Sequence, residues 1–177
     1  MIKEGQIVEI PSLSSIYIED GSVFSSKKEE LIQKLKKKNY NLFDGFLVGE
    51  HHGIGAFKLG QRKGINVGGK KAPLYVIGIN KETNQLFVGE GDNHPGLFTD
   101  LICFPIARTD FQKNESIENG SDVTIISSAF QSKINARIYI YDDILYLELE
   151  KPNSITLQNG LLEISFKNNN HTTIKIN

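Results

Sequence analysis

The sequence predicts a mainly β protein, in which a small roll-like β domain with one inserted helix precedes a small antiparallel β-barrel. Short apolar runs, separated by turn-forming residues, recur along most of the chain. One segment alone has the apolar spacing and the end signals of a helix. The length of 177 residues accommodates one ordinary domain or two small β modules.

The first half of the chain combines short strands with the predicted helix. Residues 2–10 alternate loosely and stop at Pro11, as expected of a short strand that leads into irregular structure. A helical insertion is predicted at about residues 25–39, because serines precede it, acids lie in its first turn and lysines lie in its last. Further strands are predicted at residues 45–49, 74–79 and 85–89.

The second half has the pattern of β structure throughout. Strands are predicted at residues 123–129, 136–141, 144–149, 161–166 and 172–176. Asp142-Asp143 and residues 167–170 supply polar turns between them. Prolines and a polar stretch interrupt the pattern near residues 98–112, so we place a domain boundary there. The predicted domains are a central β domain at residues 1–100 and a C-terminal β-barrel at residues 101–177.

The composition is that of an ordinary soluble globular protein, with 39% hydrophobic and 23% charged residues. No apolar run approaches the roughly 20 residues that a membrane span needs. The first residues lack the pattern of a signal peptide or an organellar presequence, so we expect a cytoplasmic protein. The single cysteine, Cys103, excludes an internal disulfide or a CxxC zinc site, and its apolar neighbours predict a buried thiol.

The net charge of −1 argues against a strongly basic nucleic-acid binder, but the charges are segregated along the chain. The segment Lys58–Lys71 holds five cationic side chains and no acid. Its glycines allow tight turns and the close approach of a ligand, while Arg62 matches phosphate oxygens and Gln61 can pair with a base edge or a ribose. An anion-binding loop and a solvated basic hairpin both remain open on composition alone. The lysine-rich helix supplies a second basic surface, for which a solvated face is the usual explanation.

Three other kinds of site receive no support from the sequence. Gly64–Lys70 matches GxxxxGK, the pattern of a nucleotide phosphate loop. However, Lys71 stands where a Ser or Thr should ligate magnesium, and the chain continues as strand instead of helix. Metal binding is not expected, since the adjacent His51 and His52 point to opposite faces of a strand. No group of acids, bases or nucleophiles has the spacing of a catalytic centre.

Five short motifs follow one another along the first part of the chain. They are Val48–Gly53, Leu59–Gly69, Pro73–Val76, Asn84–Gly89 and Asp92–Leu97. The first two contain a GxHxG element and the string GQRKG followed by GG. In order and spacing the motifs resemble the tRNA-specific 2-thiouridylase family. The resemblance covers residues 2–105 in detail and the remainder by strand pattern alone.

The resemblance implies a three-part sulfurtransferase, with an N-terminal ATP-pyrophosphatase domain, a central β domain and a C-terminal β-barrel that together grip tRNA. The intact enzyme would use ATP to adenylate the wobble uridine at its C2 carbonyl and would then insert sulfur from a cysteine persulfide. This chain starts after that machinery, has no SGGxDS loop, and carries Cys103 downstream of the matching motifs. We therefore expect the chain alone to hold no cofactor and to be non-catalytic. Its expected partners are tRNA and a separate or missing ATP-pyrophosphatase domain.

The resemblance and the residue chemistry together predict the contacts with tRNA. Cations of the glycine-rich segment would hold the tRNA backbone, and a glutamine and a histidine would position it. The predicted nucleic-acid-binding residues are His52, Gln61, Arg62, Lys63, Gly64, Gly68, Gly69, Lys70, Lys71 and Gln131.

The last third departs from the family pattern. Ser128–Gln131 stands where an Arg-Tyr-Arg-Gln strand is usual, and Thr156–Asn159 stands where a TPGQ turn is usual. The loss of arginines should weaken RNA binding, which leaves an alternative function, a structural or protein-interaction β module without RNA affinity. An independent small-molecule enzyme would need a polar pocket around His51, His52 and His94, and the spacing does not support one.

Overall fold

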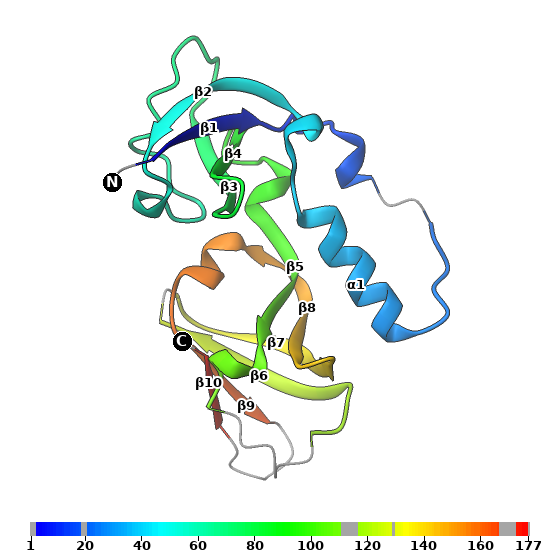
Figure 1. The fold of residues 1–177 in the computed structure, drawn as a ribbon. Coiled ribbons are helices and arrows are strands. Elements are labelled where there is room, and N and C mark those ends of the chain that lie inside the picture. The colour runs from blue at the N-terminus through cyan, green and yellow to red at the C-terminus, as the bar shows by residue number, and fades with distance from the viewer. Residues whose placement is uncertain (1–2, 19–20, 111–116, 129, 167–172, 177) are drawn as a thin grey trace. The chain divides into compact units, whose positions relative to one another are not determined.

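The computed structural model describes residues 3–18, 21–110, 117–128, 130–166 and 173–176 (Figure 1). The chain divides into two compact units, of which the first comprises Met1–Phe98 with Ser154–Thr156 and the second Thr99–Asn153 with Leu157–Asn177. The described residues form ten strands, one α-helix and six short 3-10 helices, which confirms the mainly β prediction. None of the helices in the described parts of the chain is long and apolar enough to cross a membrane.

The first unit is built on a four-stranded sheet in the order β2-β1-β4-β3. Its strands are β1 (Glu4–Glu9), β2 (Phe46–His52), β3 (Leu74–Asn80) and β4 (Gln85–Glu90). β1 pairs antiparallel with β2 and parallel with β4, and β3 and β4 form an antiparallel hairpin. β2 and β3 are therefore the edge strands, and β2 follows the upper side of the sheet in cyan (Figure 1).

Both faces of this sheet carry an apolar cluster, because successive side chains of β1 point to opposite sides. Ile7 packs in one cluster with Val76 and Leu86. Val8 packs in the other cluster with Ile77 and Phe87. The pair Ile7-Val8 is apolar at two successive positions, so β1 is covered on both sides rather than on one.

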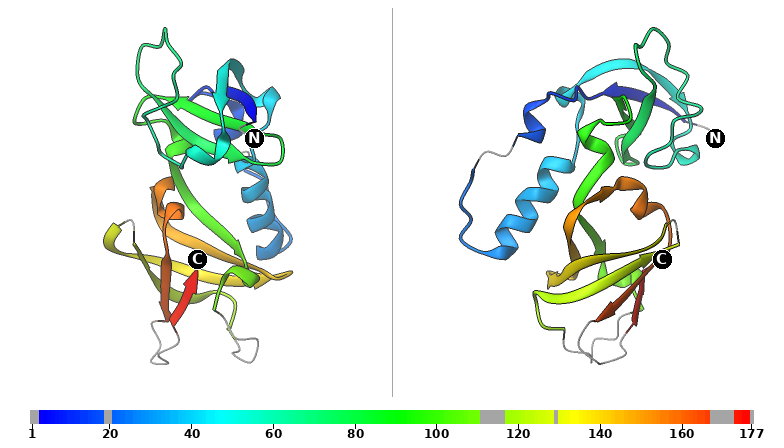
Figure 2. Two further views of the ribbon diagram at one scale, coloured as in Figure 1. Left: turned by 60° about the vertical axis from the view of Figure 1, so that its left-hand side comes forward. Right: turned by 180° about the vertical axis from the view of Figure 1, so that it is seen from behind.

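The helical insertion lies between β1 and β2. It contains η1 (Ser15–Tyr17), α1 (Lys27–Lys38) and η2 (Leu42–Asp44). Ser26 caps α1, since its Oγ accepts a hydrogen bond from the Glu29 N–H at 3.2 Å. The helix predicted at about residues 25–39 is confirmed with these end signals, and Figure 2 shows from two further sides that it stands beside the sheet.

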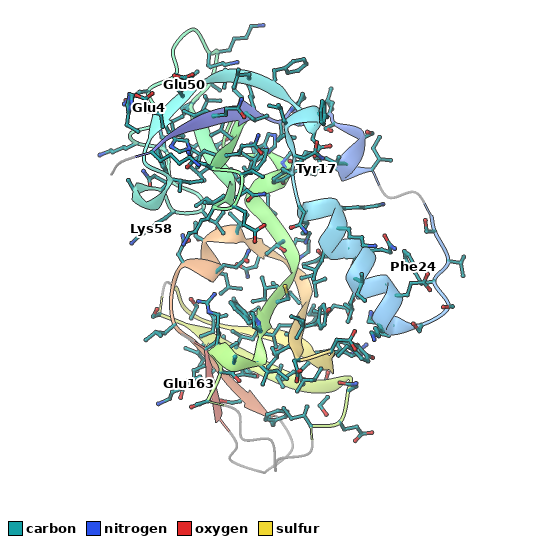
Figure 3. The ribbon with its side chains drawn as sticks, viewed as in Figure 1. Glu4, Tyr17, Phe24, Glu50, Lys58 and Glu163 are labelled. Carbon is teal, nitrogen blue, oxygen red and sulfur yellow. The ribbon has the colours of Figure 1, made fainter. Side chains whose placement is uncertain are left out.

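A buried group of aromatic side chains fastens the insertion to the sheet. Tyr17, which points from η1 toward the sheet in Figure 3, places its hydroxyl oxygen 3.0 Å from that of Tyr40. Tyr17 also meets the His94 ring edge-on, with 5.5 Å between the ring centroids. His94 donates from Nε2 to the Ile10 carbonyl oxygen at 2.9 Å, and its Nδ1 accepts from the Gly96 N–H at 3.1 Å. Burial lowers the pKa of His94, so the ring is neutral and serves as a structural support of the turn η4 (Pro95–Leu97).

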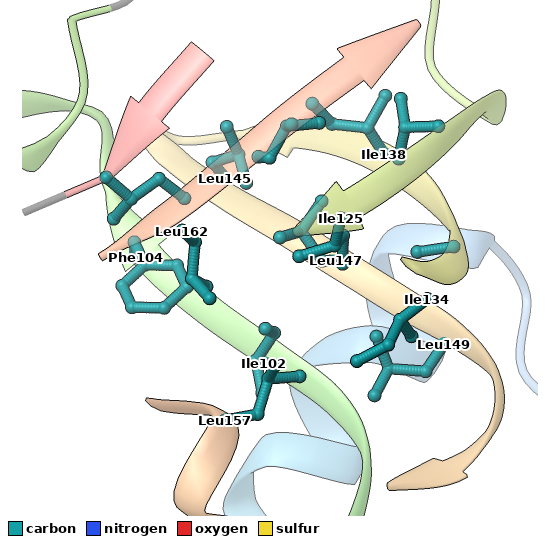
Figure 4. Close-up of a cluster of buried hydrophobic side chains, with 14 residues drawn as sticks. Ile102, Phe104, Ile125, Ile134, Ile138, Leu145, Leu147, Leu149, Leu157 and Leu162 are labelled. Carbon is teal, nitrogen blue, oxygen red and sulfur yellow. The ribbon is translucent and has the colours of Figure 1, made fainter. Parts of the chain in front are cut away.

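The second unit is built on a curled, antiparallel six-stranded sheet in the order β10-β9-β6-β7-β8-β5. Its strands are β5 (Phe98–Pro105), β6 (Ser121–Ser127), β7 (Phe130–Tyr141), β8 (Ile144–Ser154), β9 (Leu162–Phe166) and β10 (Thr173–Ile176). The inner face holds one apolar cluster, in which Ile102, Ile138 and Leu147 are among the buried side chains (Figure 4). Asp142 and Asp143 both have positive φ, 51° and 60°, and form the predicted tight turn between β7 and β8.

Two features of the second unit differ from the sequence prediction. β5 occupies residues 98–105 of the region near residues 98–112 that we expected to interrupt the pattern, and Pro105 is its last residue. Cys103 is half-buried and not fully buried, since it alternates along β5 with the buried Ile102 and Phe104. Burial raises the pKa of its thiol. The turn predicted at residues 167–170 lies outside the described residues.

Candidate nucleic-acid interface

The basic loop, Lys58–Lys71, connects β2 to β3 through the short helix η3 (Ile54–Ala56). Its start is fixed to β3 by two backbone hydrogen bonds, from Gly60 N–H to the Val76 carbonyl at 2.7 Å and from Val76 N–H to the Gln61 carbonyl at 2.9 Å. Gly60 has a φ of +75°, and a Cβ there would lie 2.3 Å from Cγ2 of Thr156. Packing and backbone conformation therefore both require glycine at position 60.

Two apolar side chains hold the middle of the basic loop against the sheet. Ile65 is only 4% exposed and belongs to the cluster around Ile7. Val67 packs against the same cluster and lies above β2, where a Cβ on Gly49 would come within 3.1 Å of its Cγ2. The loop is consequently a supported structure, whose apolar side lies on the sheet and whose Lys58 side chain points outward (Figure 3).

The loop encloses an open pocket of about 420 Å³. The pocket is lined by Arg62 and by Gly64–Leu74, a set with three cationic side chains and no acid. A Cβ on Gly68 or Gly69 would meet nothing within 4 Å. The floor of the pocket at these glycines is therefore accessible to a ligand.

The main chain of the loop has hydrogen-bond donors that are not used within the described residues. Within the described residues, the backbone N–H groups of Arg62 through Lys71 donate no hydrogen bond to any other group, whereas Ala72 donates to Oε1 of Glu90 at 2.7 Å. Positive φ values at Gly64, Asn66 and Gly69 turn the chain repeatedly along this stretch. Unpaired N–H groups beside cationic side chains favour the binding of an anion with several oxygens, such as a phosphate.

The cations of the loop are not equivalent. Lys70 forms an ion pair with Glu9 of β1, and both side chains are largely buried. In the part of the chain that the structure describes, Lys58, Arg62, Lys63 and Lys71 have no carboxylate partner, and all four are exposed. Lys70 thus holds the loop to the sheet, and the other four supply its uncompensated positive charge.

The predicted positioning residues have partners within the chain. Oε1 of Gln61 accepts from the Lys58 N–H at 3.0 Å, and Nε2 donates to the Lys63 carbonyl at 2.8 Å, so this amide also closes the turn of the loop. His52 is exposed on β2, with Nδ1 at 3.0 Å from Oε1 of Glu4.

His51 points to the other side of β2 from His52, as the alternation of a strand predicts. It is 2% exposed and stacks edge-on against Phe57, just before the basic loop. Its Nε2 lies 3.3 Å from the Asn84 carbonyl oxygen, while Nδ1 has no partner among the described residues. The sequence predicts His52 as a nucleic-acid-binding residue and does not predict His51. Alternation along the strand separates the two side chains, but it does not show which of them is buried.

The structure gathers some of the predicted site residues and separates others. Arg62, Gly64, Gly68, Gly69, Lys70 and Lys71 line the pocket, and Gln61 and Lys63 lie in the same loop outside that lining. Gln131 belongs to the second unit, and its side chain lies outside the described residues. The strand predicted after Gly64–Lys70 is confirmed, since β3 begins at Leu74. The described residues contain no group of three His, Cys, Asp or Glu side chains that could hold a metal ion.

Three polar residues on the outer side of β7 are paired with carboxylates of neighbouring strands. Arg137 lies 3.6 Å from Asp122, and Asn135 donates to Glu150 at 3.0 Å. Tyr139 donates to Glu148 at 3.4 Å. This surface therefore presents less uncompensated positive charge than the basic loop of the first unit.

The sheet and the basic loop define a β module with a cationic, glycine-rich pocket. The family model described as the tRNA methyl transferase PRC-barrel domain matches residues 28–90, which include all of α1 except its first residue and the whole basic loop. The chain is 45% identical over 96 residues to the tRNA-specific 2-thiouridylase MnmA of Christiangramia forsetii, a match that covers 54% of the chain and 24% of the relative.

Two further relatives extend the match over most of the chain. The tRNA-specific 2-thiouridylase MnmA of Karelsulcia muelleri is 34% identical over 167 residues, which cover 94% of the chain and 41% of the relative. That of Flavobacterium johnsoniae is 31% identical over 155 residues, or 86% of the chain and 39% of the relative. The chain belongs to the tRNA 2-thiouridylase family and corresponds to its central and C-terminal portion. It spans less than half of the length of these relatives.

Proposed function

We propose that the chain is the tRNA-binding portion of a tRNA 2-thiouridylase, the enzyme of wobble-uridine 2-thiolation, and that the basic loop holds the tRNA backbone. The observation that carries the proposal is the open pocket, where free backbone N–H groups lie beside Arg62 and Lys71. We propose tRNA as the substrate because the relatives are named tRNA-specific 2-thiouridylases.

In the proposed function, the basic loop binds tRNA and takes part in no chemical step. Lys58, Arg62, Lys63 and Lys71 would neutralise phosphates and release their counterions, while the N–H groups near Gly68 would fix the position of one phosphate. Lys70 would keep the loop in place through Glu9. ATP does not fit this pocket as it fits a nucleotide phosphate loop, because β3 follows where a helix N-terminus would be needed. We infer that ATP and the persulfide donor act at another part of the intact enzyme.

The alternative function, a structural or protein-interaction module, is favoured by one observation in the second unit. Carboxylates already pair with Arg137, Asn135 and Tyr139 on the outer side of β7. We therefore assign RNA binding to the first unit and a supporting role to the second.

The proposal is tested by charge reversal in the basic loop. The variant Arg62→Glu/Lys63→Glu/Lys71→Glu leaves the ion pair of Lys70 intact. A matched control, Lys81→Glu/Lys133→Glu/Lys151→Glu, changes the net charge equally at three exposed lysines outside the loop. Binding of unmodified tRNA with a wobble uridine is measured for each chain across a salt series.

We expect the loop variant to lose most of its affinity at low salt. The slope of log affinity against log salt should fall by about one for each reversed cation, while the control keeps the wild-type slope within about one. Equal losses in both variants would show that net charge and not the loop governs binding. No binding by the wild-type chain at low salt would favour the alternative function.

A further inference from the structure

An exposed aromatic side chain lies at the edge of the sheet, on the same face as the basic loop. Phe46, the first residue of β2, is 66% exposed. Because large apolar side chains are usually covered when they occur in a strand, an exposed phenylalanine beside a charged loop needs an explanation.

The register of β1 and β2 sets the direction of this side chain. Phe46 pairs with Glu9, and directly opposed residues of an antiparallel pair project to the same face. Glu9 is the carboxylate that holds Lys70, so Phe46 projects to the face on which Lys70 joins the sheet. Further along β2, Gly49 lies beneath Val67 of the loop, which confirms that the loop covers this face.

The next residue, Leu47, points to the opposite face because side chains alternate along a strand, and a bulge after it determines which face that is. Val48 is an extra residue in β2, so that Gly49 pairs with Ile7 and Leu47 with Val8. Val8 belongs to the cluster on the far face, and Leu47 therefore points away from the basic loop. Leu47 is 57% exposed, which makes it a matched neighbour of Phe46 with the other orientation.

The start of β2 is held in place before any ligand binds. Asn41 and Asp44 form a capping box around η2, with the Asn41 N–H donating to Asp44 Oδ2 at 2.8 Å and the Phe43 N–H donating to Asn41 Oδ1 at 2.9 Å. The next residue, Gly45, lies so close to Glu9 that a Cβ would come within 2.1 Å of the Glu9 carbonyl oxygen. The Phe46 ring is thus presented from a fixed backbone, which lowers the entropy cost of binding.

We propose that Phe46 is a stacking platform for an unpaired base of the RNA whose phosphates the basic loop holds. This inference rests on the proposed function and specifies which part of the RNA meets the first unit. The loop that Lys70 fastens to this face also carries cations without a carboxylate partner, Lys71 among them, and this charge favours a polyanion over an apolar protein segment as the occupant. Bases in a duplex are already stacked, so the ring can receive only a base from a loop, bulge or single strand.

The proposal is tested with a fluorescent residue at position 46. The chain contains no tryptophan, so Phe46→Trp and Leu47→Trp each place one reporter on β2, on opposite faces of the sheet. Each full-length variant is titrated with a hairpin RNA that has an unpaired loop and with the same strand fully paired to its complement. We expect the hairpin to quench the emission of Phe46→Trp and to leave that of Leu47→Trp unchanged, while the duplex quenches neither.

An affinity measurement accompanies the fluorescence. Phe46→Ala should bind the hairpin about 5- to 100-fold more weakly than the wild type, and Leu47→Ala should match the wild type. Quenching of both reporters, or full affinity of Phe46→Ala, would contradict the stacking role of Phe46. Neither result would contradict the proposal that the basic loop binds phosphates. A concentration-dependent change in the emission of Phe46→Trp without RNA would identify this face as a contact between protein copies. Failure of the wild-type chain to bind either RNA would overturn the proposed function itself, and the platform with it.

Discussion

Replacing Gly68 by alanine should separate the stability of the protein from its affinity for RNA. The φ of Gly68 lies outside the left-handed range, and a Cβ there would meet nothing within 4 Å. Alanine therefore introduces no strain in the folded chain, and it reduces the freedom of the unfolded chain by about 0.4–1 kcal/mol. We expect the midpoint of urea unfolding of Gly68→Ala to equal or slightly exceed that of the wild type.

The same methyl group would occupy the pocket that we assign to a phosphate. Keeping the phosphate away from one backbone N–H removes a charge-assisted hydrogen bond worth about 1.5–3 kcal/mol. This loss corresponds to about 10- to 150-fold weaker binding. Fluorescence anisotropy with labelled tRNA at one low salt concentration measures the difference.

Gly60→Ala is the matched control for this prediction. With a φ of +75° and Thr156 Cγ2 at 2.3 Å from the new Cβ, it should destabilise the fold by about 1–3 kcal/mol. Wild-type tRNA binding by Gly68→Ala, or a loss of stability as large as that of Gly60→Ala, would contradict the assignment of Gly68 to the phosphate site.

Three further predictions concern the supports of the first unit. Burial lowers the pKa of His94 below its unfolded value of about 6.5, so its contribution to stability is complete above about pH 6.5 and is lost as the pH falls toward the folded pKa. His94→Gln should therefore flatten the dependence of the urea midpoint on pH below 6.5, and an unchanged slope would exclude His94 as its source. Tyr17→Phe removes the hydrogen bond to Tyr40 and should cost about 0.5–1.5 kcal/mol in urea unfolding, whereas no loss would mean that this bond does not stabilise the insertion. Ile65→Ala empties a buried position under the basic loop and should cost about 2–4 kcal/mol, with weaker tRNA binding at the same salt; wild-type affinity would show that the loop needs no apolar support.

Much of the fold could be predicted because its signals are local. The serine cap of α1, the connector between β3 and β4 and the Asp142-Asp143 turn are all fixed by residues within a few positions of one another. β5 was harder to recognise, because its proline terminates the strand and local composition does not distinguish a terminus from an interruption.

The candidate site could be predicted only in part. Its composition can be read from consecutive residues, whereas its geometry depends on contacts between residues far apart in the chain. The charge and glycine content of the basic loop are visible in the sequence, but the pairing of Lys70 with Glu9 joins positions far apart in the chain. The direction of Phe46 depends on the bulge at Val48, which shifts the register by one residue. Periodicity alone would not show which of two successive apolar residues faces the loop.

The most direct test of the account is hydrogen exchange of the backbone amides of the 177-residue chain with and without unmodified tRNA. The N–H groups of Arg62 through Lys71 have no partner among the described residues, so they should exchange fast in the free protein. We predict that tRNA slows the exchange of this segment, with the largest effect at Gly68 and Gly69. Unchanged exchange in the basic loop, together with new protection confined to the second unit, would contradict the assignment of the loop as the tRNA-binding element.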